Sequence, residues 1–282
     1  MNDMNNMTVY TQEELNKIQA VELAVLKEFI RVCELLKVEY FVDGGTAIGA
    51  VRHGGFIPWD DDVDLAMPRS DYQKFCKEAN IYLSKDFYLQ TPYNDKNCPY
   101  YYSKLRVNGT EFIEYCNRKV NMHQGIYIDI YPFDEVPDDE KDNIRQFKKM
   151  QFLTRLFTLH QSPDISSEPV SFSDRIKSAI RHILHWVTKC IPYSLLSNQI
   201  EQTMTKYNGT NQSAIACVYS PKRNWDYIPK DKIYPLKDLK FEDISVKIVN
   251  DYDYYLRNLY GDYMEFPPEN ERFGHKPWKV TI

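Results

Sequence analysis

Residues 41–67 read FVDGGTAIGAVRHGGFIPWDDDVDLAM, and this stretch decides how the rest of the chain is interpreted. After a glycine pair and a turn, four aspartates follow within five residues. Carboxylates this close repel one another, so they need a cation, protons or open water. Because side chains alternate between the faces of a strand, Asp60, Asp62 and Asp64 would share one face, opposite Asp61 and apolar residues. The pattern predicts a metal-binding edge on a core strand.

The composition is that of a globular protein with one large or two small domains: 282 residues, 43% hydrophobic and 27% charged. The net charge of −5 argues against a broad nucleic-acid surface, so we expect no nucleic-acid partner. Six cysteines without zinc or C-x-x-C spacing indicate free thiols in a reducing compartment. The first residues lack a signal-peptide pattern, and no stretch approaches the ~20 apolar residues of a membrane span. We therefore expect a cytoplasmic protein, either soluble or in peripheral contact with the inner face of the cell membrane.

A second carboxylate-bearing strand is predicted some sixty residues downstream. In the run GIYIDIYP, residues 125–132, the isoleucines point one way, and Tyr127, Asp129 and Tyr131 point the other. Asp129 is thus a single carboxylate on a core strand, and its best partners are the three aspartates that share a face. Asp129 would either complete a metal cage or accept a proton from an attacking hydroxyl.

The remaining elements follow from periodicity and from turn and capping residues. A capping box at Thr11 predicts a long amphipathic helix to about residue 37, and Ser70 is expected to cap a second helix. Further predicted elements are a strand at 38–42, a short helix at 46–52, strands at 87–90, 100–107 and 111–115 with a hairpin turn at 108–109, a hairpin around 241–249, and a helix at 251–260.

The sequence between residues 138 and 212 is helix-rich, and within 174–191 an apolar stripe is decorated by basic residues. Such a helix either packs on the domain or lies on an anionic membrane surface, and both readings stay open. We predict an α+β fold in which a mixed β-sheet is flanked by helices. Its parts would be a catalytic core (1–137), a helical insertion (138–212), and a C-terminal α/β extension (213–282) that packs on the core and completes the substrate site.

The acids and glycines together suit phosphoryl transfer. Gly44 and Gly45 after a strand let backbone N–H groups approach an anion closely. Asp62 and Asp64 can hold Mg²⁺ through hard oxygen ligands, with Asp129 as the third carboxylate. Each part alone is ordinary, but the dense order of glycine pair, turn and four aspartates is far rarer than its parts. Metals that neutralise phosphate oxygens are what in-line phosphoryl transfer requires.

The same residues carry a resemblance to a known family. The chain resembles the LicD family, phosphotransferases with a nucleotidyltransferase fold that are related to fukutin and the fukutin-related protein. The matching segments are 43–46, 49–64, 102–106, 125–132, 259–268 and His275. They leave out mainly residues 141–211, and the segment around the aspartates is the most specific.

The resemblance implies both a reaction and roles for residues. LicD-like enzymes take a CDP-activated donor, such as CDP-choline or a CDP-polyol, and transfer its phospho-group to a sugar hydroxyl of a glycan or lipid-linked glycan acceptor, releasing CMP. By motif, Gly44, Gly45 and Thr46 would bind the donor. Asp62, Asp64 and Asp129 would be catalytic and would bind Mg²⁺, or alternatively Mn²⁺, while Asp60 would lie behind them.

Basic residues should accompany a diphosphate, and five are candidates for substrate contacts: Arg52, His53, Lys104, Arg106 and His275. For Arg52 a salt bridge to an aspartate is an equal alternative, and for His275 an ordinary surface position. Trp59 and Trp225 could stack on cytosine, although a core role suits each.

Other functions remain open at this stage. A nucleotidylyltransferase would use the same metal site but release pyrophosphate, and a glycosyltransferase would use its D-x-D pair for a nucleotide sugar. A non-catalytic acidic module that binds Ca²⁺ is the alternative outside catalysis, although the spacing does not fit an EF-hand loop. The transferred group is also open: choline favours an aromatic cage, whereas a polyol needs hydrogen-bonding groups.

Overall fold

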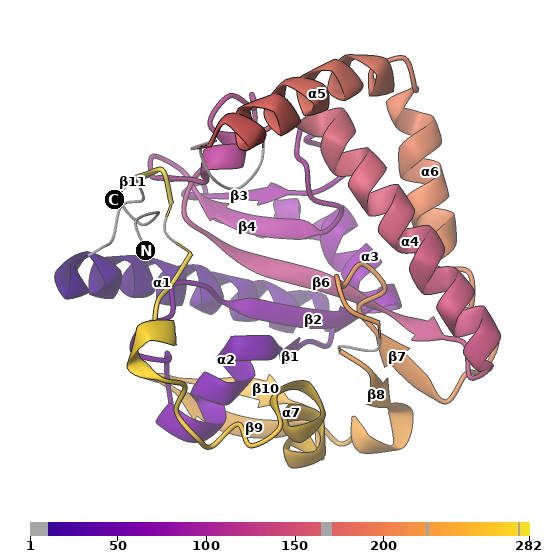
Figure 1. The fold of residues 1–282 in the computed structure, drawn as a ribbon. Helices are drawn as coiled ribbons and strands as arrows, with labels where there is room; N and C mark the ends of the chain where they lie inside the picture. Colours follow the sequence, from indigo (N-terminus) through magenta and orange to yellow (C-terminus); the bar gives the residue numbers. More distant parts are fainter. Residues whose placement is uncertain (1–10, 165–170, 224–225, 276) are drawn as a thin grey trace.

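The computed structural model describes residues 11–164, 171–223, 226–275 and 277–282. A mixed β-sheet lies at the centre and helices flank it, which confirms the predicted α+β class (Figure 1). The strands are β1 (Phe41–Val42), β2 (Asp64–Pro68), β3 (Phe87–Gln90), β4 (Ser103–Val107), β5 (Glu111–Ile113), β6 (Tyr127–Val136), β7 (Ala214–Ala216), β8 (Ile228–Pro229), β9 (Lys237–Phe241), β10 (Ile244–Ile248) and β11 (Lys279–Thr281). The helices are α1 (Gln12–Leu36), α2 (Gly44–Ile48), α3 (Arg69–Glu78), α4 (Glu140–Gln161), α5 (Phe172–Thr188), α6 (Tyr193–Met204) and α7 (Tyr252–Tyr260), with a π-helical turn at Gly49–His53.

The strand order of the main sheet is β1-β2-β6-β4-β3, and β7 and β8 extend it from β6. β2 and β6 are adjacent and parallel, whereas the other pairings in this sheet are antiparallel. The parallel register places Asp64 beside Asp129. The two segments that carry the predicted carboxylates therefore lie next to each other at the centre of the sheet.

One face of the sheet is closed by α1 and α3, which pack against β2, β4 and β6. The predicted capping box is present, since Thr11 and Glu14 bond each other's backbone N–H at the start of α1. Side chains of the helices and strands form one apolar core there, including the fully buried Leu65, Ile128 and Ile130. Because side chains alternate along a strand, Asp129 and its tyrosine neighbours project from the opposite face.

The structure moves several predicted boundaries: the strands predicted at 38–42, 100–107 and 111–115 are shorter, and two further changes concern the site. The strand of the aspartates begins only at Asp64, so Asp60 and Asp62 lie in the segment that leads into it. The predicted alternation nonetheless holds, because Asp61 and Val63 are buried whereas Asp60, Asp62 and Asp64 are partly exposed. The helix predicted at 46–52 begins earlier, with the glycine pair inside α2, and continues as the π-helical turn.

Two local predictions are wrong. Ser70 does not cap α3, which begins after Pro68 without a side-chain cap. The strands on either side of Asn108 and Gly109 do not form a hairpin: β4 pairs with β3 and β6, and β5 pairs with β11 from the end of the chain. Turn residues predict a reversal of direction, but a more distant strand competes for the backbone hydrogen bonds.

The C-terminal part follows its predicted local structure. β9 and β10 form an antiparallel hairpin. Asp251 caps α7, and Gly261 ends it with φ of 70°. The chain then returns along the sheet to add β11 beside β5, and this return carries His275 to the aspartates.

Helices α4, α5 and α6 all lie within residues 138–212, and Figure 1 shows them along one side of the sheet. α4 and α6 share a second core with β7 that includes Met150, Phe157 and Ile200. A buried ion pair joins α3 to β6: Arg69 donates two hydrogen bonds to Asp134, at 2.7 and 2.5 Å. The same guanidinium reaches α6, where it lies 3.5 Å from the Glu201 carboxylate. The domain boundaries themselves stay a prediction.

We expect Asp134→Ala to lower the free energy of unfolding by roughly 3–5 kcal/mol, because the buried Arg69 guanidinium would keep only Glu201, 3.5 Å away, as a carboxylate partner. The matched control is Glu13→Ala, which removes an exposed ion pair to Lys17 and should leave stability unchanged within error. Urea denaturation of both variants measures the difference. Equal, small losses would contradict the role given to the buried pair.

Candidate active site

The structure brings Asp62, Asp64 and Asp129 to one cavity of about 250 Å³. Asp64 is the first residue of β2, Asp62 lies two residues before it, and Asp129 faces Asp64 from β6. Lys104, from β4, and His275 line the same cavity. The three predicted acids therefore line one cavity, and two of the five basic candidates accompany them.

The glycine pair makes room for the acids. A Cβ on Gly44, whose φ is +51°, would lie 3.2 Å from Asp64 Oδ2, and a Cβ on Gly45 would lie 2.8 Å from Asp60 Oδ2. Thr46 is buried, and its hydroxyl accepts the backbone N–H of Asp64 at 2.8 Å. The start of α2 thus fixes where Asp64 stands. Of Gly44, Gly45 and Thr46, Gly44 lines a cavity that Asp64 also lines. Contact of these three residues with the donor stays a prediction.

The cavity concentrates negative charge. Burial raises the pKa of Asp64 well above its ordinary value, and the Asp62 and Asp129 carboxylates raise it further. Burial and the neighbouring Asp62 raise the pKa of Asp60 to about 8, and these two carboxyl groups hydrogen-bond to each other. Among the described residues, none donates a hydrogen bond or forms an ion pair with the Asp64 carboxylate.

Two cations offset part of this charge. The Lys104 ammonium lies 2.5 Å from Asp129 Oδ1 and 3.5 Å from the centre of the Tyr127 ring. His275 Nδ1 is 3.0 Å from Asp61, and its Nε2 is 3.6 Å from Asp62. The hydrogen bond to Asp61 raises the pKa of His275 to about 10, so the ring is a cation at neutral pH. His275 is therefore part of the acidic cluster rather than an isolated surface histidine.

The carboxylate groups of Asp62, Asp64 and Asp129 suit a divalent cation. Asp64 is a carboxylate without a partner among the described residues, and Asp62 and Asp129 line the same cavity. Hard oxygen ligands of this kind suit Mg²⁺ or Mn²⁺. As the side chains stand, no three His, Cys, Asp or Glu residues in the described part of the chain form a ready-made metal cluster. Asp62, Asp64 and Asp129 remain the residues that would hold the ion.

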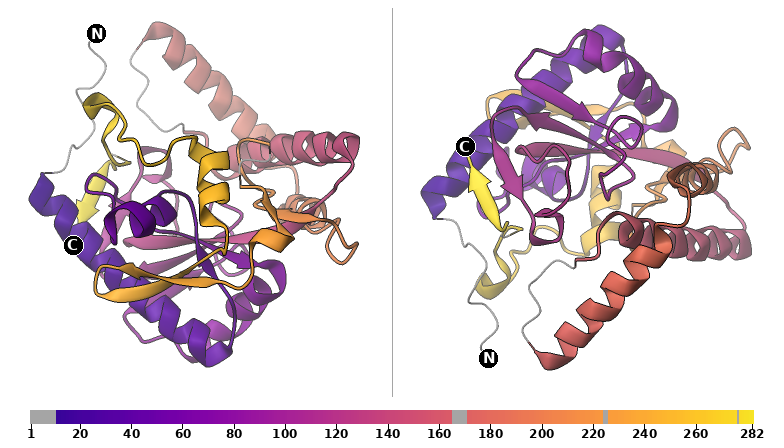
Figure 2. Two further views of the ribbon diagram at one scale, coloured as in Figure 1. Left: turned by 90° about the horizontal axis from the view of Figure 1, so that it is seen from below. Right: turned by 90° about the horizontal axis from the view of Figure 1, so that it is seen from above.

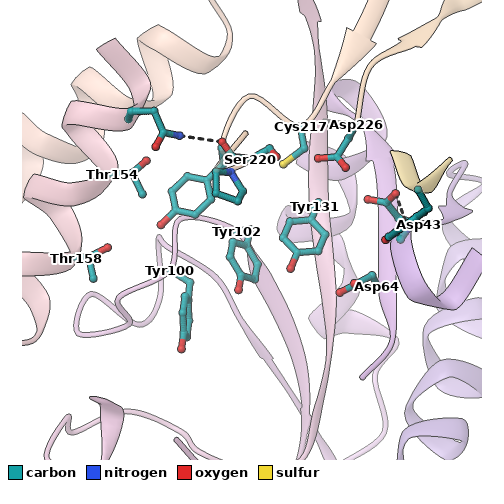
Figure 3. A pocket seen from close by; sticks show the side chains of 15 residues that line it. Asp43, Asp64, Tyr100, Tyr102, Tyr131, Thr154, Thr158, Cys217, Ser220 and Asp226 are labelled. Carbon is teal, nitrogen blue, oxygen red and sulfur yellow. Dashed lines mark hydrogen bonds between the residues drawn. The ribbon is translucent and has the colours of Figure 1, made fainter. Parts of the chain in front are cut away.

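A larger cavity of about 430 Å³ adjoins this one, and the two share Asp64, Tyr100, Tyr102 and Tyr131. Figure 3 shows Tyr100, Tyr102 and Tyr131 in a row between α4 and Asp64, with their hydroxyls pointing the same way. The Tyr131 hydroxyl donates to Asp129 Oδ2 at 3.1 Å, so this row lies at the junction of the tyrosine-lined cavity and the cavity of the three aspartates.

The rest of the tyrosine-lined cavity comes from distant parts of the chain. Tyr219 and Asp226 follow the helical segment in the sequence, and Tyr260 is the last residue of α7. Burial and the Asp43 carboxylate raise the pKa of Asp226 to about 8. The sequence analysis assigned none of these residues to the site, although Tyr260 lies in the matching segment 259–268.

Three of the five basic candidates lie elsewhere. Arg52 donates to the carbonyls of Tyr263 and Glu265 and stacks on Phe266. No ion pair joins Arg52 to an aspartate among the described residues. Neither Arg52 nor its neighbour His53 lines the two cavities just described.

Arg106 is buried and donates to Gln90 and to the carbonyl of Gly125, so it holds strands together rather than facing a ligand. Trp59 packs near His53 and Phe266, as a core residue would. Trp225 lies outside the described residues.

We expect Gly44→Ala and Gly54→Ala each to lower the free energy of unfolding by about 1–2 kcal/mol, because both glycines have positive φ. A Cβ at Gly54 would meet no atom within 4 Å, whereas one at Gly44 would press on Asp64. Only Gly44→Ala should therefore weaken Mg²⁺ binding in calorimetry. Equal metal affinity in the two variants would contradict the positioning role of Gly44.

Comparisons with known proteins relate much of the chain to one family. Residues 37–163 match the model of the nucleotidyltransferase domain of LicD, FKTN and FKRP. The lipopolysaccharide cholinephosphotransferase LicD of Haemophilus influenzae is 28% identical over 271 residues, which cover 93% of this chain and 95% of that protein. Human ribitol 5-phosphate transferase FKRP is 45% identical over 53 residues, 17% of this chain and 11% of that protein. Residues 37–163 thus match a LicD-family nucleotidyltransferase domain, and this matched stretch contains Asp62, Asp64 and Asp129.

Proposed function

We propose that this protein is a Mg²⁺-dependent phosphotransferase that moves phosphocholine, or a similar cationic phospho-alcohol, from a CDP-activated donor to a sugar hydroxyl of a cell-surface glycan precursor, releasing CMP. The protein is a LicD-like transferase of phosphate-containing groups. Both named relatives transfer a phospho-alcohol, phosphocholine in one case and ribitol 5-phosphate in the other. The metal, the donor and the identity of the group are the proposal.

The observation that carries the proposal is the cavity shared by Asp62, Asp64 and Asp129. When bound there, Mg²⁺ supplies charge that neutralises the phosphate oxygens of the donor and of the transition state. Lys104 and His275 line the same cavity as cations, so they would contact the remaining phosphate oxygens. Asp129 is held on both oxygens, by Lys104 and Tyr131, which fixes its orientation.

The adjoining cavity supports a cationic alcohol. Five of its lining residues are tyrosines: Tyr100, Tyr102, Tyr131, Tyr219 and Tyr260. A quaternary ammonium is attracted to aromatic ring faces and to carboxylates. Asp226 supplies a carboxyl group in the same cavity. Because the two cavities share Asp64, a donor with its diphosphate at the acids would have its alcohol within reach of the tyrosines.

A nucleotidylyltransferase is the second candidate, because the matched family model describes a nucleotidyltransferase domain. The same carboxylates would serve, but the nucleotide itself would be transferred and pyrophosphate released. Product analysis separates the two functions.

We expect Asp64→Asn to reduce CMP release from CDP-choline by roughly 10²-fold or more, because a ligand of the metal is lost at a step that depends on charge stabilisation. The assay combines CDP-choline, Mg²⁺ and a membrane glycolipid extract, with CMP measured by chromatography. Asp243→Asn is the control, since Asp243 makes an exposed ion pair to Lys27. Undiminished CMP release in Asp64→Asn would reject the metal assignment, and pyrophosphate release from CTP would favour the second candidate.

Affinity for CDP-choline should rise as the pH increases through about 8, the pKa of Asp226, because the deprotonated carboxylate attracts the ammonium group. CMP, which lacks the cation, should not show the difference. Asp60 has a similar pKa, but it would affect both ligands alike.

Calorimetry of CDP-choline and CMP in the wild type and in Asp226→Asn measures this dependence. The variant should lose the extra pH dependence for CDP-choline only. A loss of the same size for a CDP-polyol would mean that the cavity does not select a cation.

A further inference from the structure

Helix α5 presents its apolar side to solvent. Phe172, Ile183, Trp186 and Val187 expose 80%, 65%, 74% and 61% of their surface. Ile176, Ile180 and Leu184 extend the same face at spacings of three and four residues, and they too are exposed. Thr188 is the one buried residue of the helix. Figure 2 shows α5 extending away from the body of the fold.

The polar side of α5 faces the protein instead. Arg181 donates to the carbonyl of Pro163 at 2.8 Å, and His185 Nδ1 lies 2.7 Å from the carbonyl of Leu159 in α4. The His182 ring lies 3.6 Å from the buried carboxylate of Asp164. In a helix that packs by its apolar stripe, the two sides would be exchanged. α5 therefore packs on α4 by its polar side and not by its apolar stripe.

An apolar face of this extent has a free-energy cost in water, about 25 cal/mol for each Å² exposed. Monomeric proteins rarely leave such a continuous patch open without a partner. In the part of the chain that the structure describes, no element covers the outward side of α5. The face is therefore built for an apolar environment outside the part of the chain that the structure describes.

The charges around the patch identify that environment. Arg175 and Lys177 are exposed beside the apolar residues, and Lys189 follows the end of the helix. From 172 to 189 the segment has one acidic residue, Asp174, against four basic ones. A second copy of the helix would bring like charges together, whereas anionic lipid headgroups would pair with them. Trp186 suits the boundary between headgroups and acyl chains.

The helix is too short and too charged to cross a bilayer. Its 17 residues span about 25 Å, and none of the described helices combines the length and apolar character of a membrane span. A helix with one apolar face and a basic rim lies in the plane of the interface instead.

We propose that α5 docks this protein onto an anionic lipid bilayer, with its apolar face among the acyl chains and Arg175, Lys177 and Lys189 at the headgroups. α4 packs against α5 and also contributes Thr154 and Thr158 to the tyrosine-lined cavity. Docking thus holds that cavity one helix away from the membrane surface. The inference rests on α5 alone and does not depend on the proposed reaction.

The test is cosedimentation of the full chain with vesicles of phosphatidylcholine alone and of phosphatidylcholine mixed with phosphatidylglycerol. The protein should bind the mixed vesicles, and more weakly at high salt. Ile180→Glu combined with Ile183→Glu should weaken binding about tenfold or more, because both side chains belong to the apolar face that would enter the bilayer. Lys177→Glu should weaken binding to the mixed vesicles by several-fold.

Ile81→Glu is the matched control: Ile81 is 75% exposed, lies after α3 and should leave binding unchanged. All these positions are exposed, so thermal unfolding should confirm that each variant folds. The proposal is overturned if the wild type does not sediment with mixed vesicles, or if the double variant binds as well as Ile81→Glu. It is also overturned if the wild type does not bind vesicles but forms a dimer in sedimentation velocity that the double variant disrupts. The apolar face of α5 would then be covered by a second copy of the chain.

Discussion

Mutual repulsion of carboxylates at the centre of the sheet is the constraint on which the rest of the structure depends. The parallel register of β2 and β6 sets Asp64 beside Asp129, with Asp62 on the same cavity. Such a cluster is unfavourable without compensation. The fold compensates with Lys104 on Asp129 and with His275 on Asp61 and Asp62. Asp64 is left without a partner among the described residues, and a divalent cation would complete the charge balance there.

This constraint explains features that would otherwise look unrelated. Glycine at 44 and 45 leaves space for Asp64 and Asp60, and the Thr46 hydroxyl holds the Asp64 backbone. The chain end crosses back over the sheet, so that the His275 N–H and ring both bond Asp61. Local sequence around the acids and a segment more than two hundred residues away thus serve the same charge cluster.

The sequence predicted the parts of the site that depend on local alternation. Short-range patterns account for the burial of Asp61 and Val63 and for the projection of Asp129 from the face opposite the isoleucines. They also account for the capped α1 and the β9–β10 hairpin. It did not predict features that depend on tertiary choice. β5 pairs with β11 instead of β4, and Arg106 donates its hydrogen bonds to Gln90 and to the Gly125 carbonyl. The tyrosine-lined cavity joins Tyr100, Tyr219 and Tyr260, and no spacing in the sequence links these residues.

The central claim is that Asp62, Asp64 and Asp129 bind one catalytic metal together with a CDP-linked donor. The most direct measurement is anomalous diffraction from crystals grown with Mn²⁺ and CDP-choline, Mn²⁺ standing in for Mg²⁺. We predict a Mn²⁺ peak within bonding distance of carboxylate oxygens from Asp62, Asp64 and Asp129, with the donor diphosphate against it. A bound donor with no Mn²⁺ at these three residues would contradict the claim.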